Sequence, residues 1–186
     1  MDNWLDEVEA TKGWLSRVEA QLLHAAAGAV TTGCIVEVGS YRGRSTIALA
    51  SGAPDGAPVF AVEPHGYFVG ALGGEFGPAD RRAFFRTMLR TGLWDRVRLV
   101  NLSSEVIAPG WMLPVDLLWV DGDHRYEAVR RDVDVWLPHM TASARLLLDD
   151  STNAHLGPAR VVRELLDSGS FTLERQVGKV SQLLRS

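Results

Sequence analysis

Residues 35–46 read IVEVGSYRGRST, and this stretch decides the fold. Its apolar start predicts a buried strand, and Gly39 and Gly43 predict a tight turn into a helix that continues through residues 47–50. A strand-turn-helix of this kind leaves free backbone N–H groups and the positive end of a helix above the carboxyl end of the strand. The stretch therefore predicts a site above Gly39 for an adenosyl or phosphate-bearing ligand.

The spacing of the two glycines favours an amino-acid tail over a pyrophosphate. A dinucleotide site typically carries G-x-G-x-x-G, whereas here three residues with side chains separate Gly39 from Gly43. Glu37 is placed to receive a cation such as an amino group, and it would repel a pyrophosphate. The alternative, that both glycines only shape a turn, stays open.

Composition points to one domain and excludes several classes of partner. With 186 residues, of which 46% are apolar, the chain can bury one sizeable core. A net charge of -4 without a basic run argues against nucleic acid. The single cysteine, Cys34, is expected to be an inert core residue in a reducing compartment. No apolar stretch is long enough for a membrane, and the acidic residues 1–7 are unlike a signal peptide, so we expect a cytoplasmic protein.

Hydrophobic periodicity predicts alternating strands and helices. Residues 3–28 predict one helix, capped by Asn3, that packs against the rest of the chain. Strands are expected at 35–38, 59–63, 97–101, 115–120 and 145–148, helices at 80–91, 126–137 and 158–169, and an antiparallel hairpin at 171–176 and 179–184. The predicted fold class is therefore α/β: a single Rossmann-like, doubly wound sheet of about seven strands, mostly parallel with a C-terminal antiparallel hairpin. An N-terminal helical segment is placed at 1–30 and the main domain at 31–186.

Two residues near the second and third strands point to an adenosine, and the segment after the second strand is a candidate lid. Glu63 ends the second predicted strand, where a carboxylate can accept hydrogen bonds from ribose hydroxyls, although it is alternatively a solvated loop residue. Residues 64–79 contain five glycines, whose ordering costs entropy, so this segment is expected to be a mobile lid. Ser103 follows the third strand, where an adenine edge would lie, or it caps the next helix.

Carboxylates follow two neighbouring predicted strands. Asp121 comes after residues 115–120, and Asp149 and Asp150 come after residues 145–148. Carboxylates that meet in a dry crevice repel each other unless a cation lies between them. Magnesium, manganese or calcium suits these oxygens better than zinc. The sequence therefore predicts a metal site, and the alternative is that the 149/150 pair only caps a loop.

His124 lies three residues beyond Asp121, at a junction between loop and helix. With an unperturbed pKa of about 6.5, a histidine can take a proton from a substrate hydroxyl at neutral pH. The alternative is a solvent-facing or capping histidine. We interpret His124 as the candidate base.

Residues 37–46, residues 120–126 (VDGDHRY) and residues 148–150 (LDD) together resemble class I S-adenosylmethionine-dependent methyltransferases. Within that superfamily, the chain is similar to the metal-dependent O-methyltransferases of macrolide-sugar and related natural-product pathways, and to the cephalosporin-hydroxylase-like group. The resemblance covers residues 35–185. It implies a methyltransferase domain at residues 31–186.

The resemblance also implies roles for single residues. It implies that the methionine part of the cofactor is held by Glu37, Gly39, Ser40, Gly43 and Ser45, and the ribose by Glu63. To this cofactor-binding set we add Tyr41 in the same turn, Ser103 and Asp121. The implied metal ligands are Asp121, Asp149 and Asp150, and the implied catalytic residues are His124, as the base, and Asp121.

The implied activity is S-adenosylmethionine-dependent, divalent-metal-assisted O-methyl transfer to a hydroxyl of a small molecule, such as a sugar or natural product. The expected cofactors are S-adenosyl-L-methionine and Mg²⁺ or another divalent cation. A metal-independent methyltransferase of the same fold and a non-catalytic adenosyl-binding module stay open as alternatives. An NAD oxidoreductase is disfavoured by the missing middle glycine. The sequence leaves the methyl acceptor and the oligomeric state open, and a homo-oligomer is compatible with it.

Overall fold

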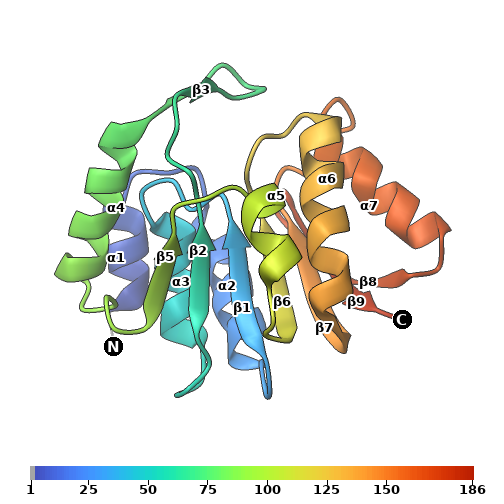
Figure 1. The fold of residues 1–186 in the computed structure, drawn as a ribbon, viewed down its shortest axis with the longest axis horizontal. Helices are drawn as coiled ribbons and strands as arrows, with labels where there is room; N and C mark the ends of the chain where they lie inside the picture. Colours follow the sequence, from blue (N-terminus) through green and yellow to red (C-terminus); the bar gives the residue numbers. More distant parts are fainter. Residues whose placement is uncertain (1–2) are drawn as a thin grey trace.

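The computed structural model describes residues 3–186. Seven strands form one sheet in the order β5-β2-β1-β6-β7-β9-β8 (Figure 1). The strands are β1 (Cys34–Val38), β2 (Val59–Val62), β5 (Val97–Val100), β6 (Val115–Val120), β7 (Met140–Leu148), β8 (Phe171–Val177) and β9 (Val180–Arg185). The first five strands in this order are parallel, and β9 runs antiparallel to both β7 and β8. The predicted α/β fold with its closing hairpin is confirmed.

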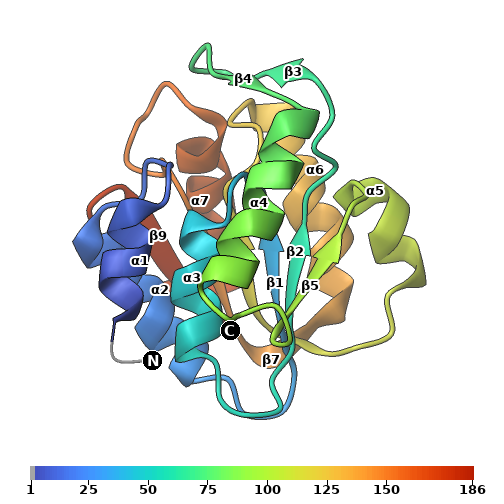
Figure 2. The ribbon, with the colours of Figure 1, turned by 90° about the vertical axis from the view of Figure 1, so that its left-hand side faces the viewer.

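Helices cover both faces of the sheet (Figures 1 and 2). They are α1 (Trp4–Ala10), α2 (Arg17–Gly28), α3 (Arg44–Gly52), α4 (Pro78–Arg90), α5 (Ser104–Ile107), α6 (Tyr126–Trp136) and α7 (Gly157–Asp167), with short 3-10 turns at Ala108–Gly110 and Leu137–His139. Successive side chains of a strand point to opposite faces. Ile35 therefore joins the core under α1 to α4, and Val36 joins the core under α6 and α7. Every residue of β1 is buried, as expected for the centre of a parallel sheet.

The prediction of one helix over residues 3–28 is wrong, because residues 11–16 separate α1 from α2. The side chain of Ser16 accepts a hydrogen bond from the backbone of Glu19, and the Glu19 carboxylate accepts one from the backbone of Ser16. This capping box starts a new helix at residue 17. Asn3 makes no side-chain capping bond to the described residues. The domain boundary after residue 30 stays a prediction.

The glycine-rich segment forms a small hairpin, β3 (Phe68–Val69) paired with β4 (Glu75–Phe76). The rings of Phe68 and Phe76 stack with their centroids 4.6 Å apart, which ties the two short strands together. The hairpin stands over the carboxyl ends of the parallel strands (Figures 1 and 2). Its expected mobility stays a prediction.

The expectations about Cys34 and about membrane-spanning segments can be compared with the structure. Cys34 is buried at the start of β1, and burial raises the pKa of its thiol to about 12, so it stays protonated and unreactive. Within residues 3–186, no helix has both the length and the apolar content needed to span a membrane.

Candidate active site

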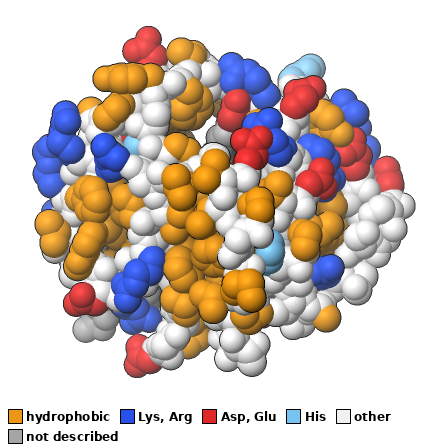
Figure 3. All heavy atoms as spheres, viewed as in Figure 1, with side chains coloured by type: hydrophobic (Ala, Val, Ile, Leu, Met, Phe, Trp, Pro, Cys, Tyr) orange, Lys and Arg blue, Asp and Glu red, His pale blue; other side chains and the backbone are white. Residues whose placement is uncertain are grey.

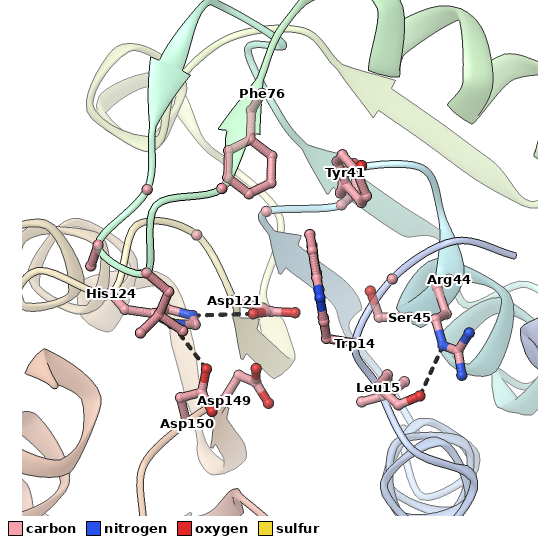
Figure 4. A pocket seen from close by; sticks show the side chains of 18 of the residues that line it. Trp14, Leu15, Tyr41, Arg44, Ser45, Phe76, Asp121, His124, Asp149 and Asp150 are labelled. Carbon is pink, nitrogen blue, oxygen red and sulfur yellow. Dashed lines mark hydrogen bonds and ion pairs between the residues drawn. The ribbon is translucent and has the colours of Figure 1, made fainter. Parts of the chain in front are cut away.

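A cavity of about 410 Å³ opens at the carboxyl ends of β1, β6 and β7 (Figure 4). Its wall combines the turn after β1, the break between α1 and α2, the β3–β4 hairpin and the acidic ends of β6 and β7. This is the position at which an open parallel sheet usually binds its ligand.

The turn after β1 depends on its glycines. Gly39 and Gly43 both have a φ of +90°, which favours glycine. A Cβ atom on Gly39 would lie 2.2 Å from the backbone oxygen of Asp121, and the Asp121 N–H donates to the Val38 oxygen at 2.8 Å. The missing side chain of Gly39 therefore allows the acidic end of β6 to lie directly beside the turn.

Six of the predicted cofactor residues line the cavity: Gly39, Ser40, Tyr41, Ser45, Glu63 and Asp121. The hydroxyl of Ser40 is buried and has no hydrogen-bond partner within residues 3–186. The carboxylate of Glu63 accepts hydrogen bonds from the N–H groups of Tyr41, at 3.3 Å, and His65, at 2.8 Å. These contacts hold Glu63 in place at the edge of the cavity.

Glu37, Gly43 and Ser103 lie outside the cavity wall that residues 3–186 form. Gly43 is the N-cap residue of α3, and Ser103 is the N-cap residue of α5 without a side-chain capping bond to the described residues. Their predicted ligand roles stay predictions.

Glu37 is fully buried, with 0% of its surface exposed. The hydroxyls of Ser45 and Thr46 each donate to its carboxylate at 2.5 Å. Burial raises the pKa of Glu37 to about 8, although these two hydrogen bonds oppose the shift. In this position Glu37 does not line the cavity, but it accepts a hydrogen bond from Ser45, which does line it. Direct contact of Glu37 with an amino group stays a prediction, and its bond to Ser45 adds an indirect route to the cavity.

The structure brings the predicted acidic residues together. Asp121 follows β6, and Asp149 and Asp150 follow β7, which is the neighbouring strand. One ring nitrogen of His124 lies 3.3 Å from Asp121 Oδ1, and the other lies 3.1 Å from Asp150 Oδ2 (Figure 4). Three potential metal-ligand atoms, one from each of Asp121, His124 and Asp149, lie within 4.8 Å of one another.

Comparison with known proteins identifies the family. Residues 36–151 match the family described as a methyltransferase domain. The chain belongs to this methyltransferase family. The methyltransferase resemblance seen in the sequence is thereby confirmed.

Solved structures share the fold of this methyltransferase. An O-methyltransferase from Bacillus cereus in complex with SAH is 18% identical with a TM-score of 0.74, and the match covers 100% of this chain and 92% of that one. The O-methyltransferase TomG from Streptomyces achromogenes, in complex with SAM, is 17% identical with a TM-score of 0.70, covering 99% and 86%. SAH-bound methyltransferase PaMTH1 from Podospora anserina is 18% identical with a TM-score of 0.72, covering 100% and 87%.

The pKa of His124 in this methyltransferase differs from the ordinary value assumed from the sequence. Burial by itself would lower the pKa, but the hydrogen bonds and negative charges of Asp121 and Asp150 outweigh burial and raise it to about 10. The imidazole of His124 is therefore protonated at neutral pH in the state that the structure describes. A protonated ring cannot accept a proton.

Lys179 was not predicted to belong to the site. It lies in the turn between β8 and β9, and its ammonium donates to Asp149 Oδ2 and lies 3.5 Å from Asp150 Oδ1. Burial and the charge of Asp121 raise the pKa of Asp149, whereas the ammonium of Lys179 opposes that shift and favours the charged carboxylate. The sequence places this lysine in a hairpin turn but does not show which end of the sheet the turn approaches.

An aromatic wall was also missed. Trp14, in the break between α1 and α2, stacks on Tyr41 with ring centroids 5.5 Å apart. Phe76 of the hairpin meets the Tyr41 ring edge to face at 5.3 Å. All three line the cavity (Figure 4). The capping signature Ser16-x-x-Glu19 was the available signal, because a helix that starts at residue 17 leaves Trp14 in a loop.

Proposed function

We propose that this methyltransferase is an S-adenosylmethionine-dependent, divalent-metal-assisted O-methyltransferase that acts on a hydroxyl of a small molecule such as a sugar or natural product. The observation that carries this proposal is the shared cavity, in which the glycine turn after β1 and the acidic ends of β6 and β7 face one space of about 410 Å³. SAM or SAH bound in several structures of the same fold supports the choice of cofactor. We further propose that the protein works in the cytoplasm and binds neither nucleic acid nor a membrane.

S-adenosylmethionine supplies a methyl group that is already activated for transfer. The chain's task is therefore to bind the cofactor and to bring an oxygen nucleophile into line with that methyl group. Within this proposal the Glu63 carboxylate accepts the ribose hydroxyls, while Ser40 and Ser45 bond the amino-acid tail. The buried hydroxyl of Ser40 supports this assignment, because it lacks a partner within residues 3–186 and a ligand would provide one.

The acidic cluster fits a divalent cation. Asp149 is 2% exposed, and its Oδ1 atom has no hydrogen-bond partner among the described residues. A buried carboxylate oxygen of this kind is costly unless a cation or donor pairs with it. Asp121, Asp149 and Asp150 would hold the ion, and oxygen donors favour Mg²⁺ or another hard cation. Such an ion supplies positive charge that lowers the pKa of a nearby hydroxyl.

His124 would accept the proton of the substrate hydroxyl. Its ring must first be neutral, and the charges of Asp121 and Asp150 keep it protonated in the structure. We therefore expect His124 to act as a base only when another cation binds these carboxylates and so lowers the pKa of the ring. The proposed base role thus depends on the proposed metal role.

A second candidate, metal-independent methyl transfer, is favoured by Lys179. Its ammonium already provides Asp149 and Asp150 with a positive partner.

One experiment separates the candidates: the purified protein is incubated with S-adenosylmethionine and a panel of hydroxylated acceptors, with Mg²⁺ or after exhaustive chelation, and products are detected by mass shift. Turnover that survives chelation would support metal independence. Cofactor binding without turnover of any acceptor would favour a non-catalytic binding module.

Glu63→Ala is expected to weaken S-adenosylmethionine binding without unfolding the protein. Each charge-assisted hydrogen bond to a ribose hydroxyl contributes about 1.5 to 3 kcal/mol, so the dissociation constant should rise roughly tenfold or more. Isothermal titration calorimetry measures this directly. Glu75→Ala, a change to an exposed carboxylate outside the cavity wall, is the matched control. An unchanged affinity in Glu63→Ala would remove the ribose assignment.

Glu37→Gln is expected to weaken cofactor binding only through Ser45. Above its raised pKa of about 8, the Glu37 carboxylate accepts from both hydroxyls, whereas the NH₂ group of an amide only donates, so the hydroxyl of Ser45 or Thr46 that faces it must turn its proton away. The comparison is therefore made at about pH 9, where the carboxylate is charged. The dissociation constant of S-adenosylmethionine should rise about three- to tenfold, the scale of one ordinary hydrogen bond. In a Ser45→Ala background the same change should have almost no effect. Additive effects in the double variant would show that Glu37 acts by another route.

A further inference from the structure

Hydrogen bonds fix the backbone of Lys179 in place, so its side chain is the part of the residue that is free to move. Its N–H donates to Glu19 Oε1 of α2 at 2.9 Å. Its carbonyl oxygen accepts hydrogen bonds from the N–H of Ser151, at 2.9 Å, and from the Ser151 hydroxyl, at 3.1 Å. The preceding residue, Gly178, has a φ of +57°, and a Cβ atom there would lie 2.3 Å from Glu19 Oε1. The hairpin turn is therefore fixed both to α2 and to the segment that follows the acidic pair.

The ammonium of Lys179 reaches the acidic cluster from this fixed turn. It donates to Asp149 Oδ2 and lies 3.5 Å from Asp150 Oδ1, and its side chain is 26% exposed. The other oxygen of Asp149, Oδ1, is buried and has no partner among the residues that the structure describes. One carboxylate thus has one oxygen neutralised by the chain and one oxygen left for a different group.

A divalent cation and the ammonium would compete for the same negative charge. Like charges within a few ångströms of each other repel strongly where water is largely excluded. A cation bound at Asp149 would therefore weaken the hold of Asp149 on the lysine. A flexible, partly exposed lysine side chain can turn toward solvent while its anchored backbone stays in place.

We propose that Lys179 is a resident cation of the acidic site, which neutralises Asp149 and Asp150 while the metal is absent and is displaced when a divalent ion binds. This inference rests on the proposed metal-assisted function and adds a residue to it. Displacement costs the lysine its ion pair, so Lys179 lowers the affinity of the site for metal. The same contact lowers the repulsion among the carboxylates in the metal-free protein.

The test compares Mg²⁺ affinity in matched variants. The chain has only two lysines, Lys12 and Lys179, and Lys12 is exposed and outside the cavity wall. Lys179→Gln should bind Mg²⁺ about ten- to a hundredfold more tightly, the range of one charge-assisted hydrogen bond. Lys12→Gln removes the same charge and should leave the affinity within about twofold, as expected for a distant, screened charge. Calorimetry with MgCl₂ measures both, and Lys179→Met repeats the test with an apolar side chain of similar length.

A second measurement uses the unaltered protein and does not depend on whether a variant folds. With ¹³C-labelled lysine, NMR should show the Cε signal of Lys179 shifting on addition of MgCl₂, while that of Lys12 stays in place. The inference would be overturned if Lys179→Gln bound Mg²⁺ with the affinity of the wild type. It would also be overturned if the Lys179 signal did not shift when Mg²⁺ binds. S-adenosylmethionine affinity measured in the same samples separates the two failures. If neither wild type nor Lys179→Gln binds Mg²⁺ but both bind the cofactor, the metal part of the function fails together with the inference, and methyl transfer stands.

Discussion

Asp121→Asn is expected to lose both Mg²⁺ binding and methyl transfer. The amide keeps the shape of the carboxylate but removes its charge, and Asp121 stands between the glycine turn and the acidic pair. Removal of outer-shell partners costs metal sites about 10- to 100-fold in affinity, so loss of a direct ligand should cost at least about 100-fold. Calorimetric titration with MgCl₂ and a methyl-transfer assay at saturating cofactor measure the two effects.

The neighbouring carboxylate provides the control for this experiment. Asp123 lies two residues away, and its Oδ2 atom pairs with the guanidinium of Arg125 at 2.6 Å, outside the cavity wall. Asp123→Asn makes the same chemical change and should keep Mg²⁺ affinity. Because Asp121 also borders the cofactor site, S-adenosylmethionine affinity is measured in both variants. Intact Mg²⁺ affinity in Asp121→Asn would contradict the metal site as assigned.

Local sequence patterns were enough to predict the frame of the site. The largely apolar residues 35–38 and the glycines at 39 and 43 predicted β1 and its turn, because few other structures accommodate that pattern. The meeting of Asp121 with Asp149 followed from a general rule, since consecutive parallel strands often lie side by side with their carboxyl ends together. Both the strand pairing and this meeting are found in the structure.

The direction of single side chains was harder to predict. Glu37 shares a face of β1 with Ile35, and α3 covers that face. Its carboxylate therefore meets the hydroxyls of Ser45 and Thr46 before it reaches any ligand. Alternation along a strand indicated which residues share a face with Glu37 but not which helix covers that face.

Sequence patterns can place Trp14 in a loop and Lys179 in a turn, but they do not show that these segments approach the cavity. Trp14 reaches the cavity from the N-terminal helices, and Lys179 reaches it from the C-terminal hairpin. Each depends on how its segment packs on the sheet, which is a tertiary effect that no local pattern encodes. The raised pKa of His124 has the same origin, because it requires Asp121 and Asp150 at opposite sides of one ring.

His124→Ala is expected to keep Mg²⁺ bound and to lose turnover by roughly 10² to 10⁴, the usual contribution of a general base. Its two nitrogens contact carboxylates of neighbouring strands, so the ring is held in one orientation beside the proposed metal ligands. The variant therefore differs in kind from Asp121→Asn, which should lose the metal as well. His155→Ala, at an exposed loop position, is the matched control and should keep full turnover.

The pH profile gives the sharper decision about His124. In the metal-free protein the two carboxylates raise the pKa of the ring to about 10, so the neutral, proton-accepting form is scarce at pH 7. A cation bound to the same carboxylates offsets their negative charge and should lower this pKa. The rising limb of the pH–rate profile should therefore move to lower pH as the site becomes saturated with Mg²⁺. The limb should vanish in His124→Ala if a slower reaction remains. Near-normal turnover in His124→Ala, or an unchanged limb in that variant, would show that another group takes the proton.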